Sequence, residues 1–90
     1  ISLRNTDIIG RWGGEEFIIL AINTDLDNAV KLAENFRATI ENYDFNLGKK
    51  GTVSIGVSNM KNGLTAEGLI KTADNALYIA KENGRNGVVY

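Results

Sequence analysis

The stretch Arg11-Trp12-Gly13-Gly14-Glu15-Glu16-Phe17 places two adjacent glycines before two adjacent carboxylates. Apolar runs flank it, Asp7-Ile8-Ile9 on one side and Phe17-Ile18-Ile19-Leu20 on the other. Two such runs joined by a glycine-containing connection predict a β-hairpin. Glycine has no Cβ, so the backbone at this turn can approach a bulky anionic ligand. The carboxylates at its tip suit a hard cation such as Mg²⁺. An ordinary turn with solvated glutamates is the alternative when these residues are taken alone.

The composition bounds the chemistry that this chain can carry. Its 90 residues fit one small domain, and 43% apolar with 23% charged residues is typical of a globular chain. The net charge of −1 argues against nucleic acid as a bulk electrostatic partner. The sequence has no cysteine and no histidine, so any catalysis must use carboxylates, Lys, Arg, Tyr, hydroxyls or a bound metal. No apolar stretch approaches the roughly 20 residues of a membrane span, so we expect a cytoplasmic protein.

Hydrophobic periodicity predicts the remaining elements. We expect strands at about 7–12, 16–22, 52–58 and 88–90. One helix should run from an N-cap at Thr24 to Asn42 or Tyr43, and another from an N-cap at Thr65 to a C′ glycine at Gly84. The predicted apolar stripes are Leu26, Ala29, Val30, Ala33, Phe36, Arg37 and Ile40, with Lys31, Glu34 and Glu41 turned outward, and then Ala66, Leu69, Ile70, Ala73, Ala76, Leu77 and Ala80.

The element order β-β-α-β-α-β predicts an α/β sandwich of the α+β type, with helices packed on an antiparallel-rich sheet. In the strand at 52–58, Val53, Ile55 and Val57 alternate with small polar residues. This pattern indicates one face on the core and another covered by something close. Gly56 in its middle suggests a near backbone neighbour or a bulge. A short strand at about 44–47, paired with this one, is a weaker prediction.

A second group of polar residues lies near the end of the later helix. Lys81 and Arg85 are four residues apart, about one helical turn, so both could reach one anion. Alternatively, both simply complement the C-terminal end of the helix dipole. Asp74 faces away from the apolar stripe, and capping, a salt bridge and chemistry all remain open for it.

Together these segments resemble the GGDEF-domain diguanylate cyclases. The hairpin stretch resembles the family's signature motif in the variant with Glu at the third position. Residues 53–57 (VSIGV) resemble its "vSiGv" strand, and residues 73–86 (ADNALYIAKENGRN) resemble its "ADxALYxAKxxGRN" helix end. The three matches occur in the family's order and cover almost the whole chain, and they imply a nucleotide-cyclase-like fold.

The resemblance implies an activity, a metal and a set of site residues. Members of the family condense two GTP molecules into cyclic di-GMP and two pyrophosphates, with two domains facing each other. Glu15 is then expected to bind Mg²⁺ (Mn²⁺ is an alternative) and to help deprotonate the attacking ribose 3′-hydroxyl, and Glu16 to assist at the metal. Gly13-Gly14 would allow backbone approach to the nucleotide, while Lys81 and Arg85 would contact the triphosphate.

Arg4 and Asp7 fit the RxxD pattern that the family places five residues before the motif. There the pattern forms an inhibitory product site, in which Arg grips bound cyclic di-GMP and Asp accepts a hydrogen bond from guanine. The resemblance therefore implies an allosteric product site at these residues. Without it, the two are an ordinary charged pair at the entrance to a strand.

One part of the family pattern has no match. The first strand with its metal-binding Asp, and the following helix that reads guanine, would precede Ile1. We therefore expect residues 1–90 to be the second half of the domain, inactive alone. Its bacterial parent should act as a homodimer with a sensor or receiver domain upstream, which could anchor it in a membrane. A non-catalytic cyclic di-GMP receptor or regulatory module, and a generic α/β interaction domain, are the alternatives.

Overall fold

The computed structural model describes residues 8–22, 24–43, 51–61 and 64–90. Within these ranges the elements are β1 (Ile8–Gly13), β2 (Glu16–Ala21), α1 (Leu26–Asn42), β3 (Ser54–Asn59), α2 (Ala66–Glu82) and β4 (Val88–Val89). The predicted order β-β-α-β-α-β is confirmed. The short strand considered at 44–47 lies outside the described residues.

The described strands form one sheet in the order β1-β2-β3-β4. The β1–β2 hairpin is antiparallel, whereas β2–β3 and β3–β4 pair in parallel. The prediction of an antiparallel-rich sheet is therefore wrong. A tight turn joins β1 directly to β2, whereas β3 and β4 each follow a helix that carries the chain back to the end where the previous strand began. Strands connected in this way run in the same direction.

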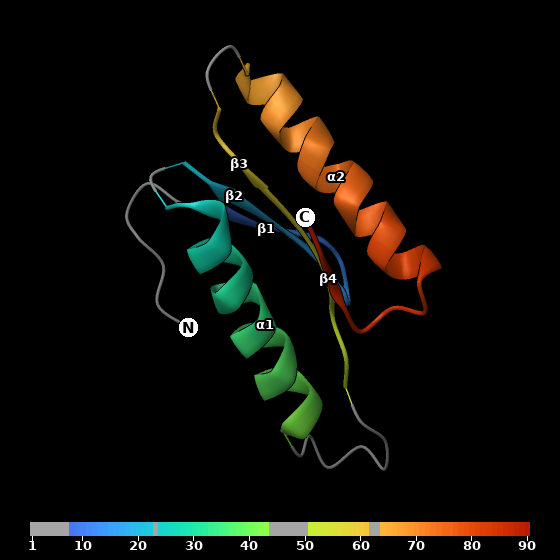
Figure 1. The fold of residues 1–90 in the computed structure, drawn as a ribbon. Coiled ribbons are helices and arrows are strands. Elements are labelled where there is room, and N and C mark those ends of the chain that lie inside the picture. Colours follow the sequence, from blue (N-terminus) through green and yellow to red (C-terminus); the bar gives the residue numbers. More distant parts are fainter. Residues whose placement is uncertain (1–7, 23, 44–50, 62–63) are drawn as a thin grey trace.

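The two described helices cover opposite faces of the sheet (Figure 1). The period-2 alternation of β2 divides its apolar run between them. Ile19 and Ala21 belong to the cluster that includes α1, while Ile18 and Leu20 belong to the cluster that includes α2. All four side chains are buried, which explains why β2 has a continuous apolar sequence instead of an alternating one.

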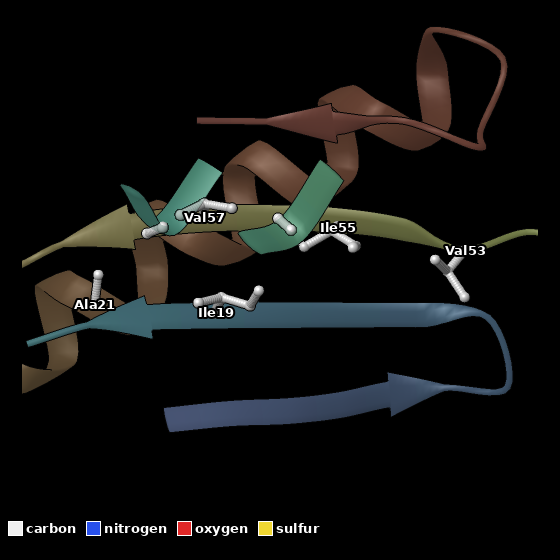
Figure 2. Close-up of a cluster of buried hydrophobic side chains, with 7 residues drawn as sticks. Ile19, Ala21, Val53, Ile55 and Val57 are labelled. Carbon is white, nitrogen blue, oxygen red and sulfur yellow. The ribbon is translucent and has the colours of Figure 1, made fainter. Parts of the chain in front are cut away.

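The α1 side holds the larger set of buried residues. Figure 2 shows Ile19 and Ala21 of β2 beside Ile55 and Val57 of β3, with Val53 just before β3. Ala29 and Ala33 of α1 complete this cluster, together with partly buried side chains that include Phe17 and Phe36. The Phe17 and Phe36 rings meet edge to face, with centroids 5.3 Å apart, and such pairs add about 0.5–1.5 kcal/mol beyond burial.

The α2 side of β3 carries only small residues because the helix lies close to the strand. A Cβ on Gly56 would lie 2.1 Å from the Ala73 carbonyl oxygen and 2.4 Å from the Leu77 nitrogen. Nearby, the buried Ser58 hydroxyl donates to the Leu69 carbonyl oxygen at 2.7 Å. These contacts confirm the predicted near backbone neighbour and the two unlike faces of this strand.

The ends of the helices largely follow the sequence. Thr65 caps α2 as predicted, its side chain accepting from the Gly68 N–H at 3.0 Å. The prediction of Thr24 as the cap of α1 is wrong, since Asp25 has the extended capping conformation and accepts from the Asn28 N–H at 2.8 Å. Either side chain could accept this bond, and the chain enters the helix one residue later than the pattern suggested.

The apolar stripes are confirmed in most positions, with three exceptions. Leu69, Ala73, Ala76, Leu77 and Ala80 of α2 are buried, but Ala66 is exposed and Ile70 is 41% exposed. Glu41 of α1 was expected to face outward, and it is half-buried because it binds Asn86 from beyond α2. A helical stripe identifies the apolar side of a helix but not which polar residues a distant segment covers.

Candidate functional site

The structure brings the hairpin to the C-terminal end of α2. Glu16 opens β2 and shares a face with Ile18 and Leu20, since side chains two apart in a strand point the same way. This is the α2 face, and there the Lys81 Nζ lies 3.1 Å from Glu16 Oε1. Both side chains are about 30% exposed, Lys81 at 30% and Glu16 at 28%, so the pair is half-buried and open to a ligand.

A small hollow of about 100 Å³ lies at this contact, lined by Glu16, Asp74, Leu77, Tyr78 and Lys81. The four lining residues from α2 are at positions 74, 77, 78 and 81, so they form one strip of its surface. Tyr78 is 62% exposed and offers an aromatic face beside the ion pair. Asp74, whose role the sequence left open, therefore lies at the site.

The hairpin turn itself is short and fixed against the sheet. Gly14 and Glu15 form the turn between β1 and β2. The Glu15 carbonyl oxygen accepts from the Ser54 N–H at 2.9 Å, which ties the turn to the start of β3. Glu15 is exposed and does not line the hollow. The structure thus places Glu16, rather than Glu15, against Lys81.

The two motif glycines differ in their surroundings. A Cβ on Gly14 would meet nothing within 4 Å, so the backbone is open to approach there. A Cβ on Gly13 would lie 3.3 Å from Glu16 Oε2, close enough to press on that carboxylate. Gly13 therefore leaves room for the present position of Glu16, and Gly14 leaves room for an external group.

The chain after α2 turns sharply through residues with positive φ. Gly84 has φ +104°, as expected for the predicted C′ glycine, and Arg85 and Asn86 follow with φ +63° and +48°. The Arg85 N–H bonds to the Ala80 carbonyl at 3.0 Å and the Gly84 N–H to the Lys81 carbonyl at 3.3 Å. This pair of bonds is the Schellman arrangement, which satisfies carbonyl groups at the end of the helix. The Arg85 side chain is exposed beyond it.

Sequence reasoning missed a polar cluster that joins this turn to α1. Arg37 Nη1 donates to Asn86 Oδ1 at 3.0 Å, and Asn86 Nδ2 donates to Glu41 Oε2 at 2.7 Å. Arg37 also pairs with Glu34 and Glu41, each at 3.2 Å. The hydrogen bond to the Glu34 carboxylate is the main cause that raises the pKa of Arg37. Sequence separations of 45 to 49 residues carry no local signal for these contacts.

The oxygen donors fit a hard divalent cation in part. Within the described ranges no group of three or more His, Cys, Asp or Glu side chains is placed to hold a metal ion. Glu15 and Glu16 nevertheless supply adjacent carboxylates, and Mg²⁺ is commonly held by one or two carboxylates together with substrate phosphates. The donor set suits Mg²⁺ that arrives with a nucleotide better than a cation caged by protein alone.

One further sequence prediction falls on residues that the structure does not describe, and another concerns a membrane span. Arg4 and Asp7, the expected product site, lie outside the described residues. In the part of the chain that is described, neither helix has the length and apolar character needed to cross a membrane.

Comparison with known proteins identifies the family. The profile described as "Diguanylate cyclase, GGDEF domain" matches residues 1–87. This chain belongs to the GGDEF family. It is 42% identical to "Diguanylate cyclase DgcM" of Escherichia coli over 86 residues, which cover 96% of the chain and 21% of that protein. It is 45% identical to "Diguanylate cyclase A" of Treponema denticola over 94% of the chain and 24% of that protein.

A third relative of this GGDEF chain is named for a regulatory role. "Response regulator PleD" of Caulobacter vibrioides is 38% identical over 98% of the chain and 21% of its own length. The chain thus spans between a fifth and a quarter of the length of these relatives. The GGDEF resemblance seen in the motifs is confirmed.

Proposed function

We propose that the complete protein containing this GGDEF chain is a diguanylate cyclase. It would condense two GTP molecules into cyclic di-GMP and release two pyrophosphates. The observation that carries this proposal is the 3.1 Å contact between Glu16 and Lys81. This contact joins the signature hairpin to the later helix motif across 65 residues and leaves a hollow beside the two charges.

Lys81 is proposed to bind the triphosphate. Its ammonium group has three donors, and Glu16 accepts one hydrogen bond, at 3.1 Å. A phosphate oxygen can therefore bind without breaking the contact with Glu16. Glu16 holds the Lys81 ammonium group beside the hollow. Without this contact the flexible Lys81 side chain would adopt many other positions. Arg85 would add a planar fork that matches two phosphate oxygens.

Glu15 is proposed to act on the attacking hydroxyl. In the condensation, the ribose 3′-oxygen of one GTP bonds to the α-phosphorus of the other, and the bond from that phosphorus to pyrophosphate breaks. The proton of the 3′-hydroxyl must leave, and an exposed carboxylate at the tip of the turn can accept it. Gly14, with open space at its α-carbon, would let the nucleotide approach this carboxylate. Gly13 would leave room for the Glu16 carboxylate in its present position.

Glu15 and Glu16 would also hold Mg²⁺ or Mn²⁺. The ion, when bound, would neutralise charge on the phosphates. Glu16 then serves both the ion and Lys81, which its two oxygens allow. The Asp74 carboxylate also lines the hollow and adds a second negative charge to it.

The assembly of the complete enzyme is part of the proposal. Each of two domains would present one GTP, so the active form would be a homodimer. The prediction that this chain is the second half of the catalytic domain, inactive alone, stays a prediction. A fused regulatory domain is supported by the name of the relative "Response regulator PleD". The receptor alternative depends on Arg4 and Asp7 and has no support from the described residues.

Turnover of the complete protein tests the proposal. GTP and Mg²⁺ are supplied, and cyclic di-GMP and pyrophosphate are measured. Glu15→Gln should abolish product formation, while Glu67→Gln, the same change at an exposed position of α2, should leave it intact. Lys81→Met should weaken nucleotide binding at least 10-fold, and Lys31→Met on the exposed side of α1 should not. Unchanged turnover in Glu15→Gln would remove the catalytic role proposed here.

A further inference from the structure

We infer that Asn86 is a positioning residue that holds Arg85 in the orientation needed to meet a nucleotide phosphate. The inference rests on the proposed function, because Arg85 is a phosphate contact only if the protein binds GTP. Asn86 itself would touch no substrate. It acts by joining the turn after α2 to the end of α1.

The contacts of Asn86 specify an amide at this position. Its Oδ1 accepts from the Arg37 guanidinium at 3.0 Å, and its Nδ2 donates to the Glu41 carboxylate at 2.7 Å. An amide is the side chain that offers one acceptor and one donor at these two atoms. Aspartate would present oxygen to Glu41 and repel it, and a leucine of similar size would satisfy neither partner.

The partners of Asn86 are themselves fixed. Arg37 also donates to Glu34 from Nε and Nη2, at 3.3 and 3.2 Å, and to Glu41 from Nη1 at 3.2 Å. Its side chain is 18% exposed, so it lies mostly within the protein surface. All three α1 residues are spaced three or four apart and share one side of the helix. Asn86 therefore binds to side chains that are already joined to one another by hydrogen bonds and ion pairs.

The backbone at Arg85 and Asn86 needs such support. Both residues have a Cβ, and their φ angles of +63° and +48° lie in the left-handed region that L-residues generally avoid. Backbone strain of this kind persists where surrounding contacts determine the conformation. Asparagine tolerates this region better than most residues, but arginine does not share that tolerance. The contacts of Asn86 with α1 supply the constraint for both.

The constraint sets the direction of the Arg85 side chain. The φ angle of a residue determines where its Cβ leaves the backbone, and the Arg85 N–H is bonded to the Ala80 carbonyl in the last turns of α2. If the turn relaxed to negative φ, this bond would break and the side chain would leave in another direction. A displacement of about 1 Å in a substrate-positioning group can cost on the order of 100-fold in rate.

The inference is tested in the complete protein by variants that move the carboxylate from position 41 to position 86 and the amide from position 86 to position 41. Asn86→Asp should raise the KM for GTP about 10-fold or more and speed exchange of the Arg85 amide hydrogen. Adding Glu41→Gln should restore both to within about 3-fold, because the amide now at position 41 donates to the carboxylate now at position 86. Asn35→Asp, the same change at an exposed position of α1, is the control and should alter neither.

Two further variants separate the possible explanations. In an Arg85→Ala background, Asn86→Asp should change the KM less than 2-fold, because there is no longer an arginine to position. Asn86→Gly accepts positive φ without the side-chain bonds, so wild-type KM and amide exchange in that variant would overturn the inference. A different pair of results would refute the proposed role of Arg85 in GTP binding, and with it the positioning role of Asn86. These results are fast exchange of the Arg85 amide hydrogen in Asn86→Asp and an unchanged KM in Arg85→Ala.

Discussion

Gly56→Ala gives a direct test of how closely α2 packs on β3. The new Cβ would lie 2.1 Å from the Ala73 carbonyl oxygen, about 1.3 Å short of ordinary contact, and 2.4 Å from the Leu77 nitrogen. Both neighbours are backbone atoms inside a helix, so neither can move aside alone. The helix as a whole must shift from the sheet, and the buried cluster that holds Leu69 and Leu77 of α2 together with Ile18 of β2 must loosen with it.

The magnitude follows from two opposing effects. Overpacking of a well-packed core costs about 1–3 kcal/mol, and this case should lie near the top of that range because the obstacle is backbone. The lower conformational entropy of an unfolded chain with alanine offsets about 0.4–1 kcal/mol. The net loss is about 2 kcal/mol. The complete domain is expected to be about twice as long as this chain, and for about 150–250 residues this loss corresponds to a fall of about 4–8 °C in Tm.

Calorimetry of the complete protein measures the unfolding transition of this domain, and amide exchange locates the change. Exchange should rise most in α2 around Leu77, whose N–H bonds to the carbonyl of residue 73 in a regular helix. Gly14→Ala is the matched control, since its Cβ would meet nothing within 4 Å, and it should leave Tm unchanged or slightly higher. A Gly56→Ala protein that melts within 2 °C of wild type would refute the close packing.

Three smaller predictions concern single contacts. Thr65→Ala should remove the N-cap of α2 and cost about 1 kcal/mol, and Thr65→Ser should keep it, as thermal unfolding will show. Ser58→Ala should cost about 0.5–1.5 kcal/mol by the same measurement, because the buried hydroxyl no longer donates to the Leu69 carbonyl. Lys81→Met should cost less than about 1 kcal/mol in stability, since its pair with Glu16 is partly solvated, while calorimetric titration with a non-hydrolysable GTP analogue should show a large loss of affinity.

The elements were predictable from sequence wherever one local pattern determines them. Alternation of Val53, Ile55 and Val57 predicted a strand with two unlike faces, and the buried α1 cluster confirms it. Gly84 marked the end of α2 because a left-handed residue is required there. In each case the cause lies within a few residues of the effect.

The direction of strand pairing was missed although the sequence contains it. Each of β3 and β4 follows a helix of 17 residues, and a helical connection favours a parallel return. The hairpin around Gly13-Gly14 is antiparallel, but it determines the direction of only one pair of strands. The contacts between Glu16 and Lys81, and between Asn86 and Glu41, depend on this topology. They could not be read from the sequence without it.

The topology also explains why positively charged side chains are needed at the proposed site. In β-α-β connections the helices run opposite to the strands. One end of the sheet therefore carries the starts of β2 and β3 together with the C-terminal ends of α1 and α2. The Glu16–Lys81 and Glu41–Asn86 contacts both lie there. Helix C-termini carry partial negative charge, the opposite of the helix N-termini that usually bind phosphate.

A triphosphate at this end of the sheet would be repelled by the negative ends of the helix dipoles. Side chains or a metal ion must therefore attract it. Lys81 was open to two interpretations from sequence, as a complement to the helix dipole or as a phosphate ligand. At a helix C-terminus one positive charge serves both purposes. The ammonium group of Lys81 offsets the negative end of the helix dipole, and by doing so it removes the repulsion that a bound anion would meet there. Replacing Lys81 with a neutral residue should therefore weaken nucleotide binding by more than the loss of one direct contact. The negative charges of the Glu16 carboxylate and of the C-terminal end of α2 would then no longer be offset by Lys81, and they would repel the triphosphate.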